Sequence, residues 1–186
     1  IIDDVLKQEV SLGIRNFSLK EDFKNDCSHA SFVLNFNDGK TNEKLKIKST
    51  GSGVIDATFT GVINQFLDTY ISLQNIKLYD FIVAVNFKEG KSTYNTDAPV
   101  EVKIALQGTA RLRNNLYFKA KSNSIVKSGV NSVCNAMEYL IGAELAVLQL
   151  SKDIKFAEER QRMDLRNIYS SQLFELVKFV SYAEVI

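Results

Sequence analysis

The sequence contains the same pattern twice, and this internal repetition restricts its fold more than any other feature. Each copy has alternating apolar runs, typical of half-buried strands, followed by an amphipathic run with the helical period. Small residues separate the last strand from the helix in both copies. These are Gly51-Ser52-Gly53 in the first copy and Ser122-Asn123-Ser124, 71 positions later, in the second. Strands, turn and helical stripe together predict a duplicated strand-strand-strand-helix unit.

The correspondence holds position by position through the last strand and the helix of each copy. At a shift of 71 positions, Leu45, Ile47, Val54, Ile55, Phe59 and Val62 align with Leu116, Phe118, Ile125, Val126, Val130 and Val133. At a shift of 70, Ala30, Phe32, Leu34 and Phe36 align with Val100, Val102, Ile104 and Leu106. A difference of one residue in the hairpin between these strands explains the change of shift.

The repeat predicts an α+β fold in which two pseudo-repeated strand-strand-strand-helix units pack together, followed by C-terminal helices. Unit one covers about residues 14–69 and unit two about residues 78–147. With the N-terminal residues they form a predicted domain over 1–147, and residues 148–186 form a predicted helical extension. A chain of 186 residues is long enough for one such domain with a shared core.

Local patterns fill in the remaining elements. Apolar spacing predicts a short helix within Ile1–Leu12, and Asp-Gly in Asn37-Asp38-Gly39-Lys40 predicts a hairpin turn. Aromatic and β-branched residues predict a strand over Leu78–Phe87, and Lys88–Asn95 has the composition of a loop. Near the C-terminus, Asp164 is the expected N-cap of a helix that extends to Val180.

Charge and residue counts exclude several classes of function. The formal net charge of +1 argues against a nucleic-acid-binding protein, which needs a basic face. Cys27, in a polar stretch that resembles a loop, and Cys134 match no metal-ligand spacing, and His29 is the single histidine. We therefore expect no metal site, no cofactor and no catalytic residue in this chain.

The sequence also predicts no association with a membrane. No apolar run approaches the ~20 residues that a membrane span needs, and no secretory leader is evident. The C-terminal amphipathic helix has too few basic residues, chiefly Arg166 and Lys178, for a membrane-surface helix. The expected location is therefore cytoplasmic.

The two predicted helix starts are candidate binding points for an anion. The first turn of a helix has free N–H groups and the positive end of the helix dipole, so it can receive a carboxylate or phosphate. Gly51 and Gly53 lack side chains and would let another group approach the backbone closely. Either helix start taken alone has an equally good structural explanation: the chain needs small residues where it turns from the strand into the helix.

Four motifs, in order, give residues from about Phe17 to Ala143 a resemblance to a known family. The chain resembles the C-terminal regulatory and dimerisation domain of the 2-isopropylmalate synthase and citramalate synthase family. The motifs are Gly51-Ser52-Gly53-Val54-Ile55-Asp56-Ala57, Leu78-Tyr79-Asp80-Phe81, Thr96-Asp97-Ala98 and Ser122-Asn123-Ser124-Ile125-Val126. The family has a proline where this sequence has Val54 and a tyrosine where it has Phe81.

The resemblance implies an allosteric domain that binds the end-product amino acid, leucine or isoleucine, and inhibits a separate acetyl-CoA-condensing barrel. It also implies a homodimer, in agreement with the commonest form of oligomer. By motif position, the effector-binding residues would be Gly53, Ile55, Asp56, Leu78, Phe81, Val85, Ala98 and Ile125. Either Asp56 or Asp80 is a candidate partner for the effector's ammonium group.

Two other interpretations remain open from the sequence. The chain could be a structural dimerisation module that has lost its effector, with Val54 and Phe81 as signs of that loss. It could also be a small acid–base enzyme using Asp56 and Asp80, although two carboxylates near a predicted cleft are the whole argument for it. Scattered acidic residues are usually solvated side chains.

Overall fold

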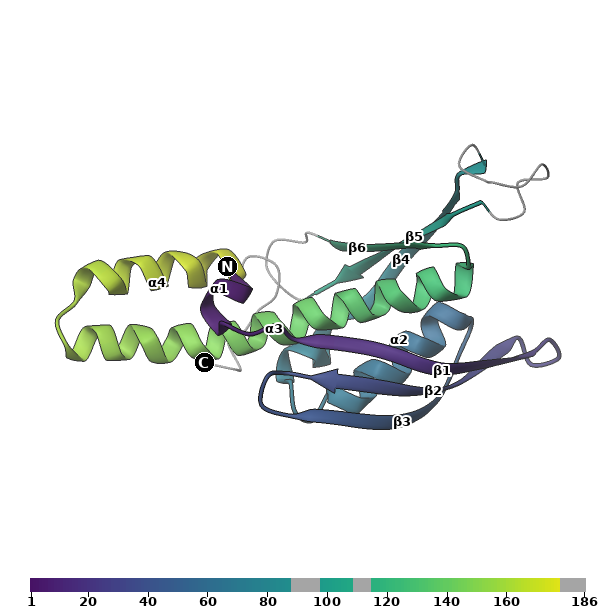
Figure 1. Ribbon diagram of the computed structural model, residues 1–186, viewed down its shortest axis with the longest axis horizontal. Coiled ribbons are helices and arrows are strands. Elements are labelled where there is room, and N and C mark those ends of the chain that lie inside the picture. The colour runs from purple at the N-terminus through teal and green to yellow at the C-terminus, as the bar shows by residue number, and fades with distance from the viewer. Residues whose placement is uncertain (88–97, 109–114, 178–186) are drawn as a thin grey trace.

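The computed structural model describes residues 1–87, 98–108 and 115–177 (Figure 1). The elements, in chain order, are α1 (Ile2–Leu6), β1 (Ser11–Asp22), β2 (Cys27–Asn37), β3 (Asn42–Gly51), α2 (Val54–Phe66), the 3₁₀ helix η1 (Ile71–Asn75), β4 (Lys77–Val85), β5 (Val100–Gln107), β6 (Leu116–Ser122), α3 (Ile125–Glu159) and α4 (Met163–Leu176).

These elements confirm the predicted α+β fold with two strand-strand-strand-helix units. The strands of each unit form a three-stranded antiparallel sheet in chain order, β1-β2-β3 in the first and β4-β5-β6 in the second. A helix follows each sheet directly, α2 after β3 and α3 after β6. The first strand of each sheet has a register irregularity, between Arg15 and Ser18 in β1 and between Leu78 and Asp80 in β4.

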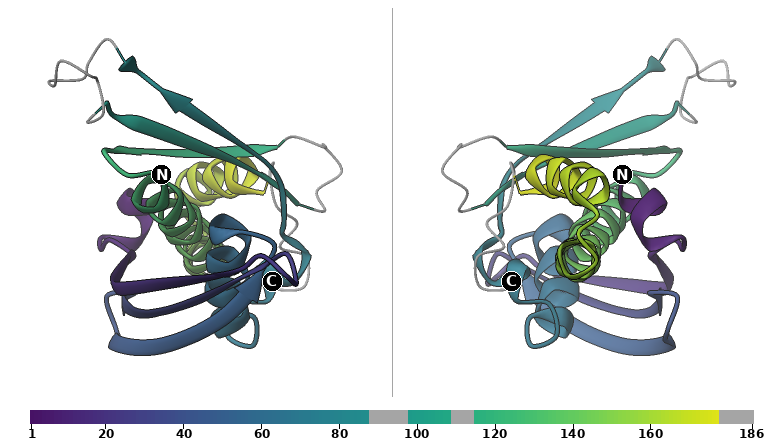
Figure 2. Two further views of the ribbon diagram at one scale, coloured as in Figure 1. Left: turned by 90° about the vertical axis from the view of Figure 1, so that its right-hand side faces the viewer. Right: turned by 90° about the vertical axis from the view of Figure 1, so that its left-hand side faces the viewer.

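The two sheets enclose the helices α2 and α3 between them, as the end-on views show (Figure 2). Strict alternation in β2 and β5 produces this arrangement, because every second side chain points toward the helices. The fully buried side chains of this layer come from both units and form one core. Among the largest are Leu34, Val62, Val102, Ile104, Leu106, Val133, Met137, Leu140 and Ile141.

The predicted hairpin between β2 and β3 is present, and its turn is fixed by one side chain. Asp38 Oδ1 accepts hydrogen bonds from the backbone N–H groups of Lys40 and Thr41 at 2.9 and 2.7 Å. Gly39 has φ of 82°, a conformation that favours glycine. Although burial raises the pKa of the Asp38 carboxyl, the hydrogen bonds from Thr41 and Lys40 outweigh it and lower the pKa overall. The turn is therefore built around an ionised carboxylate.

Helix α3 is the longest element, with 35 residues, and its second half continues far beyond the sheets (Figure 1). The boundary expected between residues 147 and 148 lies inside this continuous helix. By length and composition α3 could cross a membrane, but 67% of its most apolar stretch is buried inside the protein. Strands β1, β5 and β6 and the other three α-helices all contact α3, so much of its apolar face is packed within the fold.

The start of α4 differs from the prediction. Helix α3 ends at Glu159, Gln161 adopts a positive φ of 58°, and α4 turns back along α3 (Figure 1). Arg162 occupies the N-cap position, so the prediction that Asp164 is the N-cap was wrong. The Asp164 carboxylate binds the Arg162 guanidinium instead, at 2.7 and 2.9 Å, and this lowers the pKa of Asp164 to about 2.

The predicted N-terminal helix is also shorter than expected. It ends at Leu6, where Lys7 takes a left-handed conformation with φ of 55°, and β1 begins at Ser11. Val10, which the helical spacing includes, lies outside the helix and is buried beside Gly142 of α3. Tertiary burial outweighed the local helical pattern here. The predicted loop Lys88–Asn95 and the helix residues beyond 177 lie outside the described residues.

Candidate functional site

The starts of α2 and α3 lie side by side in the layer between the sheets. Gly129, in the second turn of α3, contacts Ile55, the second residue of α2: a methyl group at Gly129 would lie 3.0 Å from Cγ1 of Ile55. Both helices begin at the same end of the molecule and run in the same general direction (Figure 1). Two positive helix ends are thus brought to one place.

The start of α2 is open. Its N-cap residue is Gly53 in an extended conformation, and no side chain caps the first turn. A methyl group at Gly53 would meet nothing within 4 Å, whereas one at Gly51 would lie 2.4 Å from the backbone nitrogen of Ala57. The fold therefore requires glycine at position 51. At position 53 it leaves free space directly in front of the helix N–H groups.

Asp56 holds the turn that leads into α2. Its Oδ2 accepts hydrogen bonds from the backbone N–H and the hydroxyl of Ser52, at 2.8 and 3.2 Å. The side chain reaches back from the third helical position, as the acidic residue of a capping box does. This structural use accounts for one carboxylate oxygen of Asp56.

The start of α3 is closed by serines. Ser124 Oγ accepts a hydrogen bond from the Lys127 N–H at 3.3 Å, which makes it a true N-cap. Ser128 Oγ lies 2.8 Å from Ser122 Oγ and donates to the carbonyl of Val100 at 2.8 Å. These bonds tie the helix start to β5 and β6. An incoming anion would therefore find more unpaired N–H groups at α2 than at α3.

Strand β4 presents an apolar surface. A register irregularity near Tyr79 places Leu78, Phe81 and Val85 on one face of the sheet, opposite Leu106, Ile104 and Val100 of β5. Those β5 residues are buried under α3, but α3 does not extend over β4. Phe81 is accordingly 52% exposed and Val85 40% exposed. Asp80 pairs with Ala105 and lies on the opposite face from Phe81.

The structure brings some of the predicted effector residues together and separates others. Val85 pairs with Val100, which pairs with Ser122 before the start of α3, so Val85 lies two strands away from Ser122, about 10 Å across the sheet. Leu78 is at the other end of β4, about 20 Å away at the usual rise of a strand. A single amino acid, whose backbone spans about 4 Å, cannot contact both ends.

Exposure further divides the predicted residues. Ile55 and Ala98 are buried, at 4% and 6% exposure, so their side chains belong to the core. Ile125 is 49% exposed at the start of α3 and can offer apolar surface to a ligand. Thr96 and Asp97, which precede Ala98 in the third motif, lie outside the described residues. Of the predicted residues, Gly53 and Asp56 lie at the start of α2 and Ile125 lies at the start of α3, while Val85 is on β4, two strands away from Ser122.

A separate groove of about 670 Å³ lies between α1, the β2–β3 turn, α3 and α4, and none of the predicted effector residues lines it. Its lining includes Asp38, Gln149 and Tyr169. Gly129, which allows α2 to approach α3, was not among the residues singled out from the sequence. Its signal was present, because a glycine two turns or fewer from a helix start often marks a close packing contact.

No protein-family model matches this chain, and a search of curated proteins finds no match either.

Proposed function

We propose that this chain is an allosteric regulatory and dimerisation domain that binds leucine or isoleucine. It would act on a 2-isopropylmalate synthase-like acyltransferase barrel by feedback inhibition and contribute no catalytic residue of its own. The observation that carries this proposal is the uncapped start of α2, with free space at Gly53, beside the start of α3. The four motifs of the resemblance fall in the same two units.

The chemistry of a zwitterion fits this position. The carboxylate would lie in front of α2, where the N–H groups and the helix dipole favour a negative charge. The ammonium group would pair with Asp56, whose orientation is fixed by Ser52. The branched side chain would lie against the exposed apolar surface of Ile125 and Val85.

Isothermal titration of the folded protein with leucine and with isoleucine tests the proposal, and Gly53→Ala tests the location. The added methyl group would occupy the free space before α2 and should weaken binding about tenfold or more, or ~1.4 kcal/mol. Gly13→Ala in β1 is the matched control, because a methyl group there also meets nothing within 4 Å. It should leave the affinity unchanged.

The titration has clear adverse outcomes. Absence of binding with both amino acids, on protein whose circular dichroism shows it to be folded, would reject the regulatory function. Binding that Gly53→Ala leaves intact would reject this location while keeping an effector domain.

The alternative is a structural dimerisation module without an effector, and the exposed inner face of β4 favours it specifically. Phe81, Val83 and Val85 form a continuous apolar stripe on an edge strand, and such a surface is typical of an interface. A second copy of the chain is the proposed partner, since isologous pairing is the commonest closed arrangement.

Dimerisation is tested by light scattering coupled to size-exclusion chromatography over a range of concentrations. Phe81→Lys should weaken the dimer at least tenfold because it places a charge in the apolar stripe. Tyr117→Lys is the control: Tyr117 is 57% exposed on β6, but it pairs with Ala105 and so lies on the other face of the sheet. A wild-type monomer at every concentration, or equal effects of both changes, would contradict this interface.

A further inference from the structure

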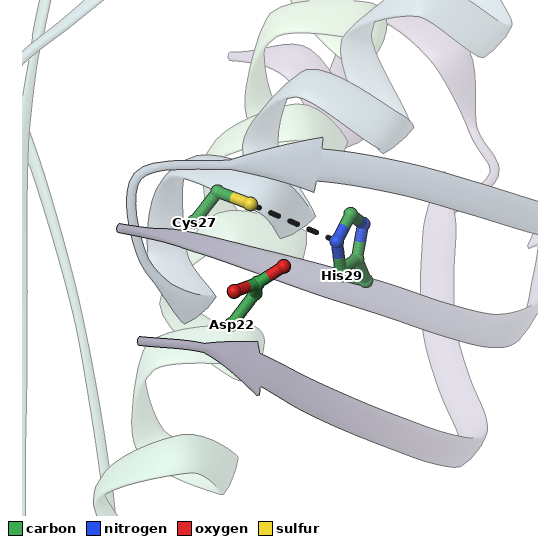
Figure 3. A group of neighbouring side chains, drawn as sticks. All are labelled: Asp22, Cys27 and His29. Carbon is green, nitrogen blue, oxygen red and sulfur yellow. Dashed lines mark hydrogen bonds between the residues drawn. The ribbon is translucent and has the colours of Figure 1, made fainter. Parts of the chain in front are cut away.

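Three potential metal ligands meet at the turn end of the β1–β2 hairpin. Asp22 is the last residue of β1, Cys27 is the first residue of β2, and the two are direct cross-strand partners. His29 lies two residues along β2 and therefore on the same face of the sheet as Cys27. Figure 3 shows the three side chains facing one another, and one ligand atom from each lies within 4.8 Å of the other two.

The separation of the cysteine and histidine ligand atoms is compatible with a tetrahedral zinc site. Zinc binds thiolate sulfur at about 2.3 Å and imidazole nitrogen at about 2.0–2.1 Å, which places the two ligand atoms about 3.5–3.6 Å apart at a tetrahedral angle. Cys27 Sγ lies 3.6 Å from His29 Nε2 (Figure 3). These two side chains therefore already have the separation that a shared metal ion imposes.

Hydrogen bonds to neighbouring residues orient the side chains of His29 and Asp22. His29 Nδ1 lies 2.9 Å from Thr50 Oγ1 on β3; with the proton on Nδ1, Nε2 presents its lone pair to the metal. Asp22 Oδ1 accepts hydrogen bonds from the N–H groups of Lys24 and Asn25, and its Oδ2 accepts one from the Asn25 side chain. The hairpin loop thus holds this carboxylate in place beside the other two groups.

We propose that Asp22, Cys27 and His29 bind a divalent zinc-like cation, with three protein ligands and a fourth position open to water or an outside ligand. One thiolate and one carboxylate balance the charge of the ion, and the mixed sulfur, nitrogen and oxygen set suits zinc rather than calcium or magnesium. The site lies on the outer face of β1-β2-β3. It shares no residue with the amino-acid site proposed at the helix starts, although His29 contacts Thr50, three residues before Gly53.

Cobalt(II) is the first probe, because thiolate ligation gives a near-ultraviolet charge-transfer band and tetrahedral geometry gives strong visible bands. We expect saturable bands that zinc then displaces. Cys27→Ser should abolish the charge-transfer band, and His29→Gln should weaken cobalt binding at least tenfold. Cys134→Ser is the matched control: Cys134 is the only other cysteine, is buried in α3 and should not affect the bands.

A second measurement keeps the test decisive if a variant folds poorly. In the Cys134→Ser background, zinc should slow modification of the Cys27 thiol by a thiol reagent at least tenfold, and Asp22→Asn should reduce that protection. No saturable cobalt band in the wild type, or bands unchanged in Cys27→Ser, would overturn the proposal. The 3.6 Å contact would then be an ordinary thiol–imidazole hydrogen bond.

Discussion

Strands β1 and β4 occupy the same place in the two units, yet one is covered and the other is not. The pairing of each with the next strand, together with the shift of 70 between β2 and β5, makes Leu12 equivalent to Leu78 and Ile14 equivalent to Phe81. Leu12 is 5% exposed while its equivalent Leu78 is half-buried, and Ile14 is half-buried while its equivalent Phe81 is 52% exposed. Duplication of a sequence pattern has therefore not produced equal burial.

The difference arises from the placement of one helix. Helix α3 contacts β5 and β6 of its own unit and also β1 of the other unit. Its Glu138 accepts a hydrogen bond from the backbone N–H of Leu12 at 2.6 Å, so it also closes part of the free edge of β1. Helix α2 contacts β2 and β3, and neither helix covers β4 substantially. Helix α3 of the second unit thus covers β1 of the first unit, whereas helix α2 of the first unit does not cover β4 of the second.

The largest expected effect comes from making the same change at equivalent positions of the two strands. Leu12→Ala should lower the free energy of unfolding by about 3 kcal/mol because it leaves a cavity under α3. Leu78→Ala should cost about 1 kcal/mol, since Leu78 is only half-buried. Urea denaturation at low protein concentration measures both. Equal losses in the free energy of unfolding would show that the contact of α3 with β1 does not make β1 contribute more to stability than β4.

A smaller effect is expected at the two helix starts. Gly51→Ala should destabilise the fold by about 2 kcal/mol, because the methyl group would lie 2.4 Å from the Ala57 nitrogen, a backbone atom. At the equivalent position of the second unit, Ser122 already carries a side chain. Gly53→Ala is the control and should change the stability by less than about 0.5 kcal/mol. Comparable denaturation midpoints for the two glycine variants would contradict the conclusion that Gly51 is crowded and Gly53 is not.

The smallest expected effect is a pH dependence of the contact between α3 and β1. Burial raises the pKa of the Glu138 carboxyl, partly opposed by the hydrogen bond from Leu12. The folded chain therefore binds the proton more tightly than the unfolded chain, whose value is about 4.3. This contribution to stability is full below that pH and is lost as the pH rises through the folded-state pKa.

Glu138→Gln removes this titration while keeping the size of the side chain and an acceptor oxygen. Its stability relative to the wild type should increase between about pH 4 and about pH 7, measured by urea unfolding at each pH. A constant difference across that range would mean that Glu138 titrates alike in the folded and unfolded chains.

Much of the fold could be predicted from the sequence because its signals are local. Alternation in Ala30–Phe36, the Asp-Gly turn and the helical stripe after Gly53 each act over a few residues, and the structure confirms the elements they predict. The prediction failed where long-range packing decided the outcome. Val10 fits the helical spacing but lies outside α1 and is buried near α3, and Asp164 binds Arg162 in place of capping α4.

The candidate sites were less predictable than the fold, for the same reason. The sequence indicated small residues at two helix starts, but the contact of Ile55 with Gly129 is needed to place those starts together. The polar sequence around Cys27 predicts a loop, whereas Cys27 is the first residue of β2, and a count of cysteine and histidine residues alone does not include Asp22. Only the cross-strand pairing of Asp22 with Cys27 brings a carboxylate to the other two ligands.

The sequence by itself determined that this chain forms two antiparallel units, each ending in a helix, because periodicity and turn chemistry depend on neighbouring residues. Tertiary structure decided which surfaces are covered and which side chains meet. That outcome depends on α3, whose 35 residues reach across both sheets, and on strand register. Burial and proximity are properties of residues far apart in the chain, and no local pattern specifies them.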